Sequence, residues 1–553
     1  MTDTLAIALA QLNPTVGDLE GNKALILRAR TQAAAEGADL VICTELVVTG
    51  YPPEDLVLKP MFQEQTRAVV DALAEATADG GPALLIGAPW AEGGKLYNAA
   101  LLLDGGRVEA RRYKYELPNY GVFDEVRVFA RAGLPGPIPF RGVRLGAMVC
   151  EDMWFPEVAE CLAESGAEIM IAINGSPFES DKGDARLNLA VARIGETGLP
   201  LIYVNQVGGQ DELVFDGASF VLGADHGLRA QAPAFEEAVV LTRWSREEGG
   251  WACAQEACAA LPEGHAATWR AMTAGLADYV AKNGFPGVLI GLSGGIDSAL
   301  TAAVAVDALG PERVFCVAMP SRYTAQSSLD DAAECARLLG VRYEVVGIEP
   351  AVDAMEGMLA PLFAGRAADE TEENIQARVR GVILMAISNK LGHMVLTTGN
   401  KSEMSVGYAT LYGDMCGGYS VLKDVYKTDV FEMARWRNRN WMAGLEGPQG
   451  PVVPEAIIEK PPSAELRRDQ TDQDTLPPYE VLDDVLSGLV EEERSIAEIV
   501  ARGHAAETVE RIWRMLDVAE YKRRQAPPGI KLTLRSFGKD RRYPITNRYR
   551  GAG

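Results

Sequence analysis

Short apolar runs alternate with amphipathic helical patterns along most of the chain. In the first 245 residues the apolar runs have the length of β-strands, and several lie directly before or after a helical pattern. The expected strands are residues 4–10, 38–43, 82–88, 97–104, 144–150, 168–174 and 200–206. This alternation predicts an α/β domain over residues 1–245.

A second alternating pattern begins near residue 266. The expected strands are residues 287–293, 313–320 and 342–348, with helices at 297–309 and 328–340 between them. Strict alternation of strand and helix predicts a parallel sheet with helices on both faces. We therefore expect a second domain over residues 266–553, a linker at 246–265 where the periodicity is weak, and an ordered loop at 447–479.

Composition narrows the functional class. The chain has 553 residues, 48% hydrophobic and 24% charged, as in soluble globular proteins, and its net charge of −24 argues against a nucleic-acid partner. It contains no run of 18 apolar residues, so we expect no membrane partner. The N-terminus is typical of a strand rather than a signal peptide, and eight scattered cysteines indicate reduced thiols. Together these features predict a cytoplasmic protein.

The stretch GLSGGIDSAL, residues 291–300, joins an expected strand to an expected helix. Glycine N–H groups and a helix N-terminus are suited to binding phosphate. The lysine of the Walker loop is absent, and Asp297 stands near the start of the helix. Such a loop suits a reaction in which pyrophosphate leaves as a unit, with Mg²⁺ held beside it. The alternative is a glycine-rich turn without a ligand.

Cys150 follows an expected strand, a recurrent position for a nucleophile. A cysteine nucleophile needs a base, yet none of the four histidines lies in a strand-end motif of the first domain. Glu45 and Lys114 also follow strands, so we expect Glu45 to take the thiol proton and Lys114 to stabilise an oxyanion. Taken singly, Cys150 is equally typical of a buried core residue. Glu45 and Lys114, taken singly, are equally typical of charged surface residues.

Together these motifs resemble known families. Glu45, Lys114 in YKYELPNYGVFDE and Cys150 resemble the triad of the nitrilase superfamily, and SGGIDS resembles the PP-loop of ATP pyrophosphatases. The resemblance implies a nitrilase-like α-β-β-α sandwich followed by a doubly wound parallel sheet of the PP-loop type. Their fusion, with stretches such as TTGNKSEMSVGYATLYGD and YPITNRYR, resembles the glutamine-dependent NAD synthetases over essentially the whole chain.

That resemblance implies a reaction. Glutamine is expected to be hydrolysed through a thioester on Cys150, and ammonia to pass through an interior tunnel. In the second domain, deamido-NAD (nicotinate adenine dinucleotide) is expected to be adenylated by ATP and then converted to NAD by ammonia. The products are AMP, pyrophosphate and glutamate. A homo-oligomer is implied, a dimer through the synthetase domains or a larger octamer.

The resemblance also assigns roles to residues. The expected glutamine-binding residues are Tyr51, Tyr120, Ser176 and Lys182, and Glu125 is expected to orient Lys114. The expected ATP-binding residues are Gly291, Leu292, Ser293, Gly294, Gly295, Ile296, Asp297, Ser298, Thr398 and Lys427. Deamido-NAD is expected to contact Asn374, Glu403 and Lys522, and Mg²⁺ to bind Asp297 and Glu403. Arg378 and Asp414 are further candidates, for which helix-surface or turn roles are as typical.

Two other hypotheses remain open on the sequence. One is a PP-loop amidotransferase that acts on a different acceptor acid, although the acidic charge argues against tRNA. The other is a non-catalytic scaffold in which the first domain only organises an oligomer. The joint presence of Glu45, Lys114 and Cys150 argues against the scaffold.

Overall fold

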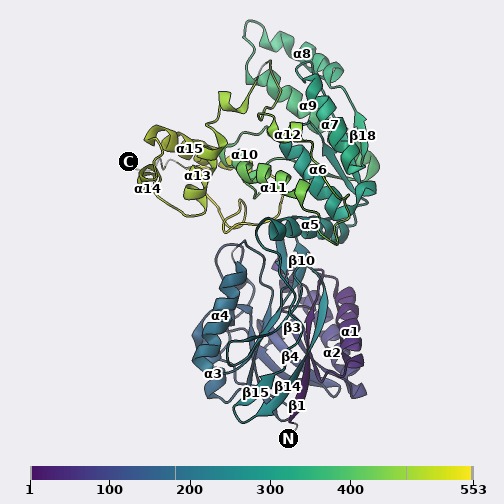
Figure 1. Ribbon diagram of the computed structural model, residues 1–553, viewed down its shortest axis with the longest axis vertical. Helices are drawn as coiled ribbons and strands as arrows, with labels where there is room; N and C mark the ends of the chain where they lie inside the picture. Colours follow the sequence, from purple (N-terminus) through teal and green to yellow (C-terminus); the bar gives the residue numbers. More distant parts are fainter. Residues whose placement is uncertain (1–2, 181, 469, 548, 550–553) are drawn as a thin grey trace. The chain divides into compact units, whose positions relative to one another are not determined.

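The computed structural model describes residues 3–180, 182–468, 470–547 and 549 (Figure 1). The chain divides into two compact units, Met1–Ala267 and Thr268–Gly553. No helix in the described part of the chain is both long enough and apolar enough to cross a membrane.

The first unit contains two large sheets. In its described residues, one sheet has the order β15-β14-β1-β2-β3-β4-β5 and the other β13-β12-β9-β8-β7-β6. The first sheet comprises β1 (Thr4–Gln11), β2 (Leu40–Ile42), β3 (Ala83–Glu92), β4 (Lys95–Asp104), β5 (Arg107–Tyr113), β14 (Ala238–Glu247) and β15 (Gly250–Cys253). The second comprises β6 (Ile138–Phe140), β7 (Val143–Val149), β8 (Ile169–Asn174), β9 (Leu201–Asn205), β12 (Phe220–Leu222) and β13 (Leu228–Gln231). A separate hairpin joins β10 (Val207–Gln210) to β11 (Leu213–Asp216).

The two sheets pack face to face, and a helical layer covers the outer face of each. Along β1, Ile7 and Leu9 lie in the core between the sheets, whereas Ala8 and Ala10 pack under the helices. This alternation is the two-residue period of a strand buried on both faces. Figure 1 shows α1 and α2 on one side and α3 and α4 on the other. The helical segments are α1 (Leu19–Ala35), α2 (Pro60–Ala76), α3 (Pro156–Glu164), α4 (Lys182–Thr197), η1 (Glu54–Leu58), η2 (Thr77–Asp79), η3 (Glu125–Arg127) and η4 (Cys150–Met153). The unit is therefore the expected α-β-β-α sandwich.

The segment 246–265, predicted to be a linker, contributes to the first unit. Residues 246 and 247 are the end of β14, which pairs with β15 at 250–253, and Trp251 is buried between the sheets. The helix α5 (Gly264–Lys282) then begins before the end of the segment. The weak sequence periodicity here reflects a short edge hairpin, in which one strand has only four residues.

The second unit is built on a parallel sheet with the order β18-β17-β16-β19-β20. Its strands are β16 (Val288–Gly291), β17 (Val314–Ala318), β18 (Arg342–Val345), β19 (Met394–Thr397) and β20 (Tyr419–Ser420). Leu289 of β16 packs with Leu384 of α9 (Glu370–Leu391) on one face of the sheet. Its neighbours Val288 and Ile290 therefore face the opposite side. There α6 (Ile296–Leu309) contacts the sheet. Parallel strands with helices on both faces confirm the doubly wound fold.

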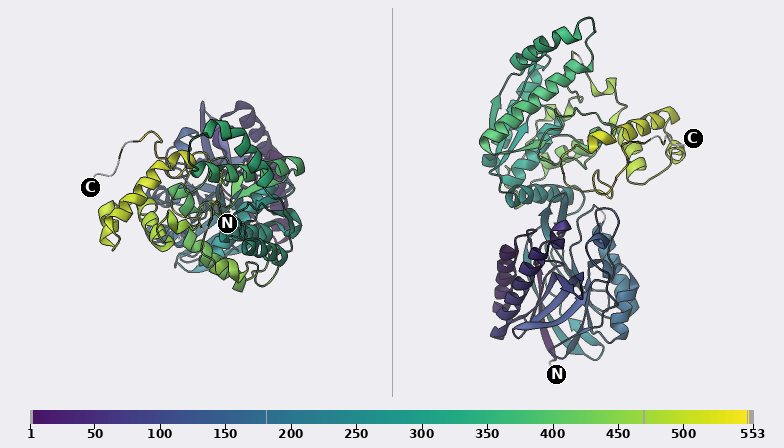
Figure 2. Two further views of the ribbon diagram at one scale, coloured as in Figure 1. Left: turned by 90° about the horizontal axis from the view of Figure 1, so that it is seen from above. Right: turned by 180° about the vertical axis from the view of Figure 1, so that it is seen from behind.

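The remaining helices of this unit form a second cluster. Helices α10, α13 and α15 share a core with residues of the final segment, and Figure 2 shows the C-terminal helices gathered at one side of the sheet. Within 447–479, expected as a loop, the structure contains the short helices α12 and η6. The further helices are η5 (Pro311–Arg313), α7 (Gln326–Leu339), α8 (Glu349–Phe363), α10 (Lys401–Val406), α11 (Lys427–Arg439), α12 (Glu455–Glu459), η6 (Asp472–Asp474), α13 (Tyr479–Val490), α14 (Ile496–Ala501), α15 (Ala506–Val518) and α16 (Glu520–Arg523).

Candidate active sites

In the first unit, three strand ends bring Glu45, Lys114 and Cys150 together. Glu45 follows β2, Lys114 follows β5, and Cys150 is the first residue of η4, directly after β7. The φ angle of Cys150 is +47°, a left-handed conformation that a residue other than glycine adopts only when its surroundings hold it there. Such a turn between strand and helix is typical of positions that present a nucleophile.

Lys114 is the centre of a buried ion-pair network. Its Nζ lies 2.7 Å from Oε1 of Glu45 and 2.8 Å from Oε1 of Glu125, and the side chains of Lys114 and Glu45 are fully buried. Asn98 Nδ2 donates to Glu45 Oε1 at 2.7 Å, and the backbone N–H of Gly175 donates to Glu45 Oε2 at 2.9 Å. Both oxygens of Glu45 are therefore fixed in place, and its carboxylate cannot rotate freely.

Burial and neighbouring charges set the protonation states of this network. Burial disfavours the charged form of Lys114, but Glu125 and Glu45 outweigh it and raise the pKa of the ammonium well above its ordinary value. Burial raises the pKa of Glu125 to about 7, against the opposing effect of Lys114. Burial and the Glu45 carboxylate raise the pKa of the Cys150 thiol well above its usual range, while Lys114 acts to lower it. These effects favour the thiol form of Cys150 in the resting protein, so a nucleophilic role for Cys150 requires a base.

The four expected glutamine-binding residues lie around this network in different environments. Tyr51 is buried and donates to Glu125 Oε1 at 2.8 Å. The Tyr120 ring is exposed, and its hydroxyl donates to Glu151 Oε1 at 3.0 Å. Ser176 is buried. Lys182 pairs with Glu179 at 3.4 Å and lies over the Phe123 ring, which itself contacts the ring of Tyr120.

Sequence reasoning did not identify several polar groups of this site. Asn98, within β4, holds Glu45, and Glu151 holds Tyr120. Burial raises the pKa of Glu151, although the charge of Lys114 opposes the shift. Glu151 directly follows Cys150, so its position beside the candidate nucleophile was a usable signal. Asn98 lies in an apolar strand far from Glu45 in sequence, and only strand pairing brings the two together.

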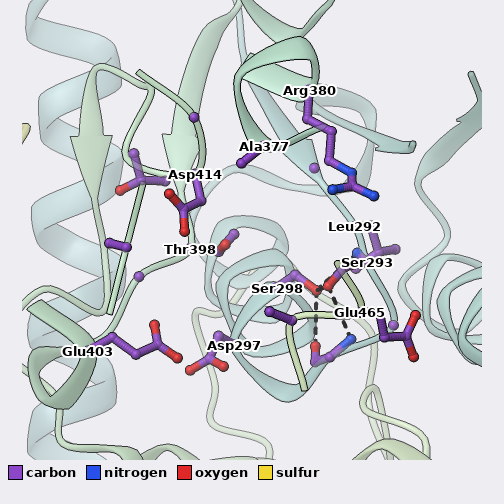
Figure 3. A pocket seen from close by; sticks show the side chains of 18 of the residues that line it. Leu292, Ser293, Asp297, Ser298, Ala377, Arg380, Thr398, Glu403, Asp414 and Glu465 are labelled. Atoms are coloured by element: carbon purple, nitrogen blue, oxygen red, sulfur yellow. Dashed lines mark hydrogen bonds between the residues drawn. The ribbon is translucent and has the colours of Figure 1, made fainter. Parts of the chain in front are cut away.

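In the second unit, the phosphate-loop motif lines a cavity of about 290 Å³. The loop follows β16, and α6 begins at Ile296. The backbone N–H of Ser293 donates to Ser298 Oγ at 3.2 Å, and the two hydroxyls are 3.1 Å apart (Figure 3). Ser298 Oγ also donates to the Gly295 carbonyl at 2.9 Å. These bonds hold the loop in a compact turn at the N-terminus of α6, an arrangement suited to an anionic ligand.

Gly294 is required by its position in this loop. Its φ angle is +81°, and a Cβ atom added to it would lie 2.1 Å from the carbonyl oxygen of Ser328. Both the backbone conformation and the close approach of α7 therefore exclude a side chain.

Asp297 and Glu403, the expected Mg²⁺ ligands, lie close together on the pocket wall (Figure 3). The ammonium of Lys427 contacts both carboxylates. Lys427 Nζ is 2.5 Å from Asp297 and 3.2 Å from Glu403, and Asn400 Nδ2 donates to Asp297 Oδ1 at 2.8 Å. Burial raises the pKa of Glu403 to about 8, against the opposing charge of Lys427.

The described residues contain no group of three or more acidic, cysteine or histidine side chains arranged to hold a metal. A pair of carboxylates beside a phosphate loop nevertheless fits Mg²⁺, which takes one or two carboxylates and completes its shell with phosphate oxygens and water. In this structure the carboxylates of Asp297 and Glu403 already hold one cation, Lys427.

The other predicted residues fall into two groups. Thr398, Asp414, Glu403 and Lys427 line the cavity. Within the described chain the lining does not include Asn374, Lys522 or Arg378. Asn374 accepts from Thr410 Oγ1 at 2.9 Å, and Lys522 Nζ donates to the carbonyls of Gly407 and Ala409, both at 2.7 Å. Arg378 donates to the Leu411 carbonyl at 3.2 Å. These three side chains hold residues 407–411 beside the cavity.

The cavity also contains charged residues that the sequence analysis missed. Arg380 of α9 lines the wall near Leu292 and Ser293 (Figure 3), and its Nε donates to the Met319 carbonyl at 3.0 Å. Burial lowers its pKa, which indicates that nearby carboxylates only partly compensate its charge. Lys460 and Glu465 lie 3.2 Å apart at the lining. Arg380 is two residues from Arg378 on a helix, and the sequence alone gave no reason to place it in the site.

The two units match two different family models. Residues 6–250 match the carbon-nitrogen hydrolases, and residues 268–526 match NAD synthase. The chain therefore combines a domain of the amide-hydrolysing class with a domain of the NAD-synthesising class.

Full-length comparisons resolve the particular family. The chain is 54% identical over 550 residues to the glutamine-dependent NAD(+) synthetase of Rhodobacter capsulatus, with 100% of both chains covered. It is 47% identical to that of Xylella fastidiosa, also over 100% of both chains. Among solved structures, the glutamine-dependent NAD+ synthetase of Acinetobacter baumannii in complex with ADP has a TM-score of 0.78 at 40% identity, with 100% of both chains covered. The chain belongs to the glutamine-dependent NAD(+) synthetases, which decides against both the scaffold and an amidotransferase for a different acceptor acid.

Proposed function

We propose that Cys150 is the nucleophile that hydrolyses glutamine. Glu45 takes the thiol proton as sulfur attacks the side-chain amide carbon, and the Lys114 ammonium stabilises the oxyanion. The carbon–nitrogen bond breaks, Glu45 returns the proton to nitrogen, and ammonia leaves a thioester on Cys150. Water activated by Glu45 then releases glutamate and restores the thiol. The ion pair of Lys114 with Glu45, at 2.7 Å beside the buried thiol, is the observation that carries this proposal.

Four residues bind glutamine in this proposal. Lys182 attracts the α-carboxylate, and Tyr51, Tyr120 and Ser176 line the path of the side chain. Their positions around the Lys114 network support these roles, since Tyr51 contacts Glu125 and Tyr120 contacts Glu151. Lys182 lies over Phe123, next to Tyr120.

In the second unit, the nicotinate carboxylate of deamido-NAD attacks the α-phosphorus of ATP. A carboxylate-oxygen–phosphorus bond forms, the bond to the β-phosphate oxygen breaks, and pyrophosphate leaves from the loop of residues 291–298. Ammonia then attacks the adenylate carbonyl, AMP leaves, and NAD is the product. Adenylation is needed because a free carboxylate repels nucleophiles and has no good leaving group.

Residues around the cavity divide this task. The loop Gly291–Ser298, with Thr398 and Lys427, binds ATP, and Glu403 contacts deamido-NAD. Asn374 and Lys522 contact deamido-NAD in this proposal, and both side chains bond to residues 407–411 beside the cavity. Mg²⁺ held by Asp297 and Glu403 would neutralise charge on the triphosphate.

Ammonia from the first unit reaches the second through the protein interior, which keeps it unprotonated. The enzyme acts on small molecules in the cytoplasm as a homo-oligomer, either a dimer through the synthetase units or an octamer. Neither nucleic acid nor a membrane takes part.

The glutaminase assignment is tested by glutamate release from wild type, Cys150→Ala and Glu45→Gln. Cys161→Ala is the matched control, because Cys161 is a free cysteine of α3 in the same unit. We expect both site variants to lose glutamate release and the control to retain it. Normal release by Cys150→Ala would refute the assignment.

A further inference from the structure

A buried carboxylate that the proposed mechanism does not use connects the two loops that carry Cys150 and Lys114. Asp152 is 1% exposed. Its Oδ2 accepts from the backbone N–H of Val149 at 2.9 Å. Its Oδ1 accepts from the backbone N–H groups of Tyr115 at 3.0 Å and Glu116 at 2.8 Å. One side chain thus bridges the residue before Cys150 and the two residues after Lys114.

We propose that Asp152 is a positioning residue that fixes the Lys114 ammonium relative to the Cys150 thiol, a role that rests on the proposed glutaminase site. The backbone of Lys114 is held on one side by β4, because its N–H donates to the Asn98 carbonyl at 2.8 Å. Beyond Lys114 the chain leaves β5, and the N–H groups of Tyr115 and Glu116 have Asp152 as acceptor. Without the Asp152 carboxylate, the hydrogen bonds that connect residues 115 and 116 to the turn at Cys150 are lost.

The turn that carries Cys150, at the start of η4, is also held by a hydrogen bond to Asp152. Cys150 has a φ angle of +47°, a left-handed conformation that persists only where surrounding bonds enforce it. The bond from Val149 to Asp152 closes the first turn of η4 around Cys150. Three N–H donors also favour the ionised form of Asp152, although burial outweighs them and raises its pKa to about 6.

The test compares wild type with Asp152→Asn, whose amide places an N–H₂ group against a backbone N–H. Asp39→Asn is the matched control, because Asp39 also accepts a backbone bond, from Ala6 at 2.9 Å, away from the site. We expect kcat for glutamate release to fall about 100-fold in Asp152→Asn, as for a misplacement of roughly 1 Å. The KM for glutamine should change little, and NAD formation from ammonium should stay at the wild-type rate. Asp39→Asn should behave as wild type.

The pH dependence of Cys150 alkylation by iodoacetamide separates positioning from a general loss of stability. Removal of the Asp152 charge by itself lowers the pKa of a nearby thiol, whereas displacement of the Lys114 ammonium raises it. We expect the alkylation pKa to rise in Asp152→Asn. An unchanged or lower pKa, or a wild-type kcat, overturns the proposal.

Two further variants keep the result interpretable. Asp152→Glu keeps the charge but moves the acceptors by one methylene, so kcat should fall between those of wild type and Asp152→Asn even if the latter folds poorly. A wild-type kcat in Asp152→Glu and Asp152→Asn rejects the positioning role. Cys150→Ala tests the proposed function itself. If Cys150→Ala still releases glutamate, the proposed glutaminase site is wrong. If Cys150→Ala is inactive and the Asp152 variants stay active, the glutaminase site stands and the positioning role of Asp152 fails.

Discussion

The ammonium of Lys427 lies 2.5 Å from the carboxylate of Asp297, on the wall of the pocket that the phosphate loop lines. Lys427 is 2% exposed and also pairs with Glu403. Its ammonium therefore contacts both acidic side chains that are proposed to receive Mg²⁺ when ATP binds. The proposed Mg²⁺ site of the second unit thus has a side-chain cation within it.

Lys427→Met should remove this side-chain cation and make the folded protein depend on Mg²⁺. Loss of one partner from a buried ion pair costs about 3–5 kcal/mol, because the remaining charges are uncompensated. We expect the variant to have a lower melting temperature than wild type. In the absence of nucleotide, addition of Mg²⁺ should raise the melting temperature of the variant more than that of wild type. Lys390→Met, at an exposed position of α9, is the control. Equal Mg²⁺ shifts in all three proteins would argue against a metal site here.

The same site predicts a pH dependence of Mg²⁺ binding. The pKa of Glu403 is raised to about 8, so the folded protein favours the protonated form of this side chain. Protonated Glu403 therefore stabilises the folded protein at low pH, relative to higher pH. This stabilisation is lost as the pH rises from the ordinary carboxylate range towards 8. A metal needs the ionised carboxylate. Mg²⁺ affinity, measured by calorimetry, should therefore rise between pH 6 and pH 8. A constant or falling affinity would contradict the assignment of Glu403.

Tyr51→Phe should shift the acid limb of glutamine hydrolysis to higher pH. The Tyr51 hydroxyl donates to Glu125 at 2.8 Å, and this bond lowers the pKa of Glu125, which burial raises to about 7. Without the bond the pKa of Glu125 rises further, so the Lys114 network gains its proton at higher pH. The measurement is kcat for glutamate release against pH, with Tyr97→Phe as control, since Tyr97 stacks on Tyr113 instead. An unshifted limb would show that Glu125 does not control the reaction.

Gly294→Ala should abolish NAD formation with either glutamine or ammonium while glutamate release continues. The added Cβ would meet the Ser328 carbonyl at 2.1 Å, at a φ angle of +81°. The loop must then shift away from its phosphate-binding geometry. Gly357→Ala is the control, because a Cβ at this position of α8 meets no atom within 4 Å. The result is read from NAD and glutamate in parallel, and NAD formation near the wild-type rate would show that the loop is not the ATP site.

Arg380→Ala should weaken ATP binding specifically. Its guanidinium lies on the cavity wall next to Leu292 and Ser293 (Figure 3), and a hydrogen bond to a charged ligand contributes about 1.5–3 kcal/mol, or roughly 10- to 100-fold in affinity. We expect the KM for ATP to rise by this factor in the ammonium reaction, with glutamate release unchanged. Arg439→Ala, at an exposed end of α11, is the control. An unaltered KM for ATP would leave Arg380 with a structural role only.

The sequence predicted the parts of this molecule that depend on local pattern. The strands before Glu45, Lys114 and Cys150, and the turn from β16 into α6, follow from short apolar runs and glycine placement. The edge hairpin of β14 and β15 was missed because four residues give no usable period.

Long-range contacts were beyond local patterns. The bonds of Asp152 to Tyr115 and Glu116 and the placement of Lys427 between two carboxylates depend on loops that are distant in sequence. The deamido-NAD contacts of Asn374 and Lys522 stay predictions, and the bonds of these side chains to the 407–411 segment were not predicted. Only tertiary packing determines which face of a helix borders the cavity, as Arg380 illustrates.

The most direct test of two linked chemistries in one chain is pyrophosphate release from ATP and Mg²⁺, in wild type and Cys150→Ala. Each protein is given deamido-NAD with either glutamine or ammonium. The account predicts that release requires deamido-NAD, that NAD forms with both donors in wild type, and that Cys150→Ala loses only the glutamine reaction. Release without deamido-NAD, or glutamine-dependent NAD formation by Cys150→Ala, would contradict it.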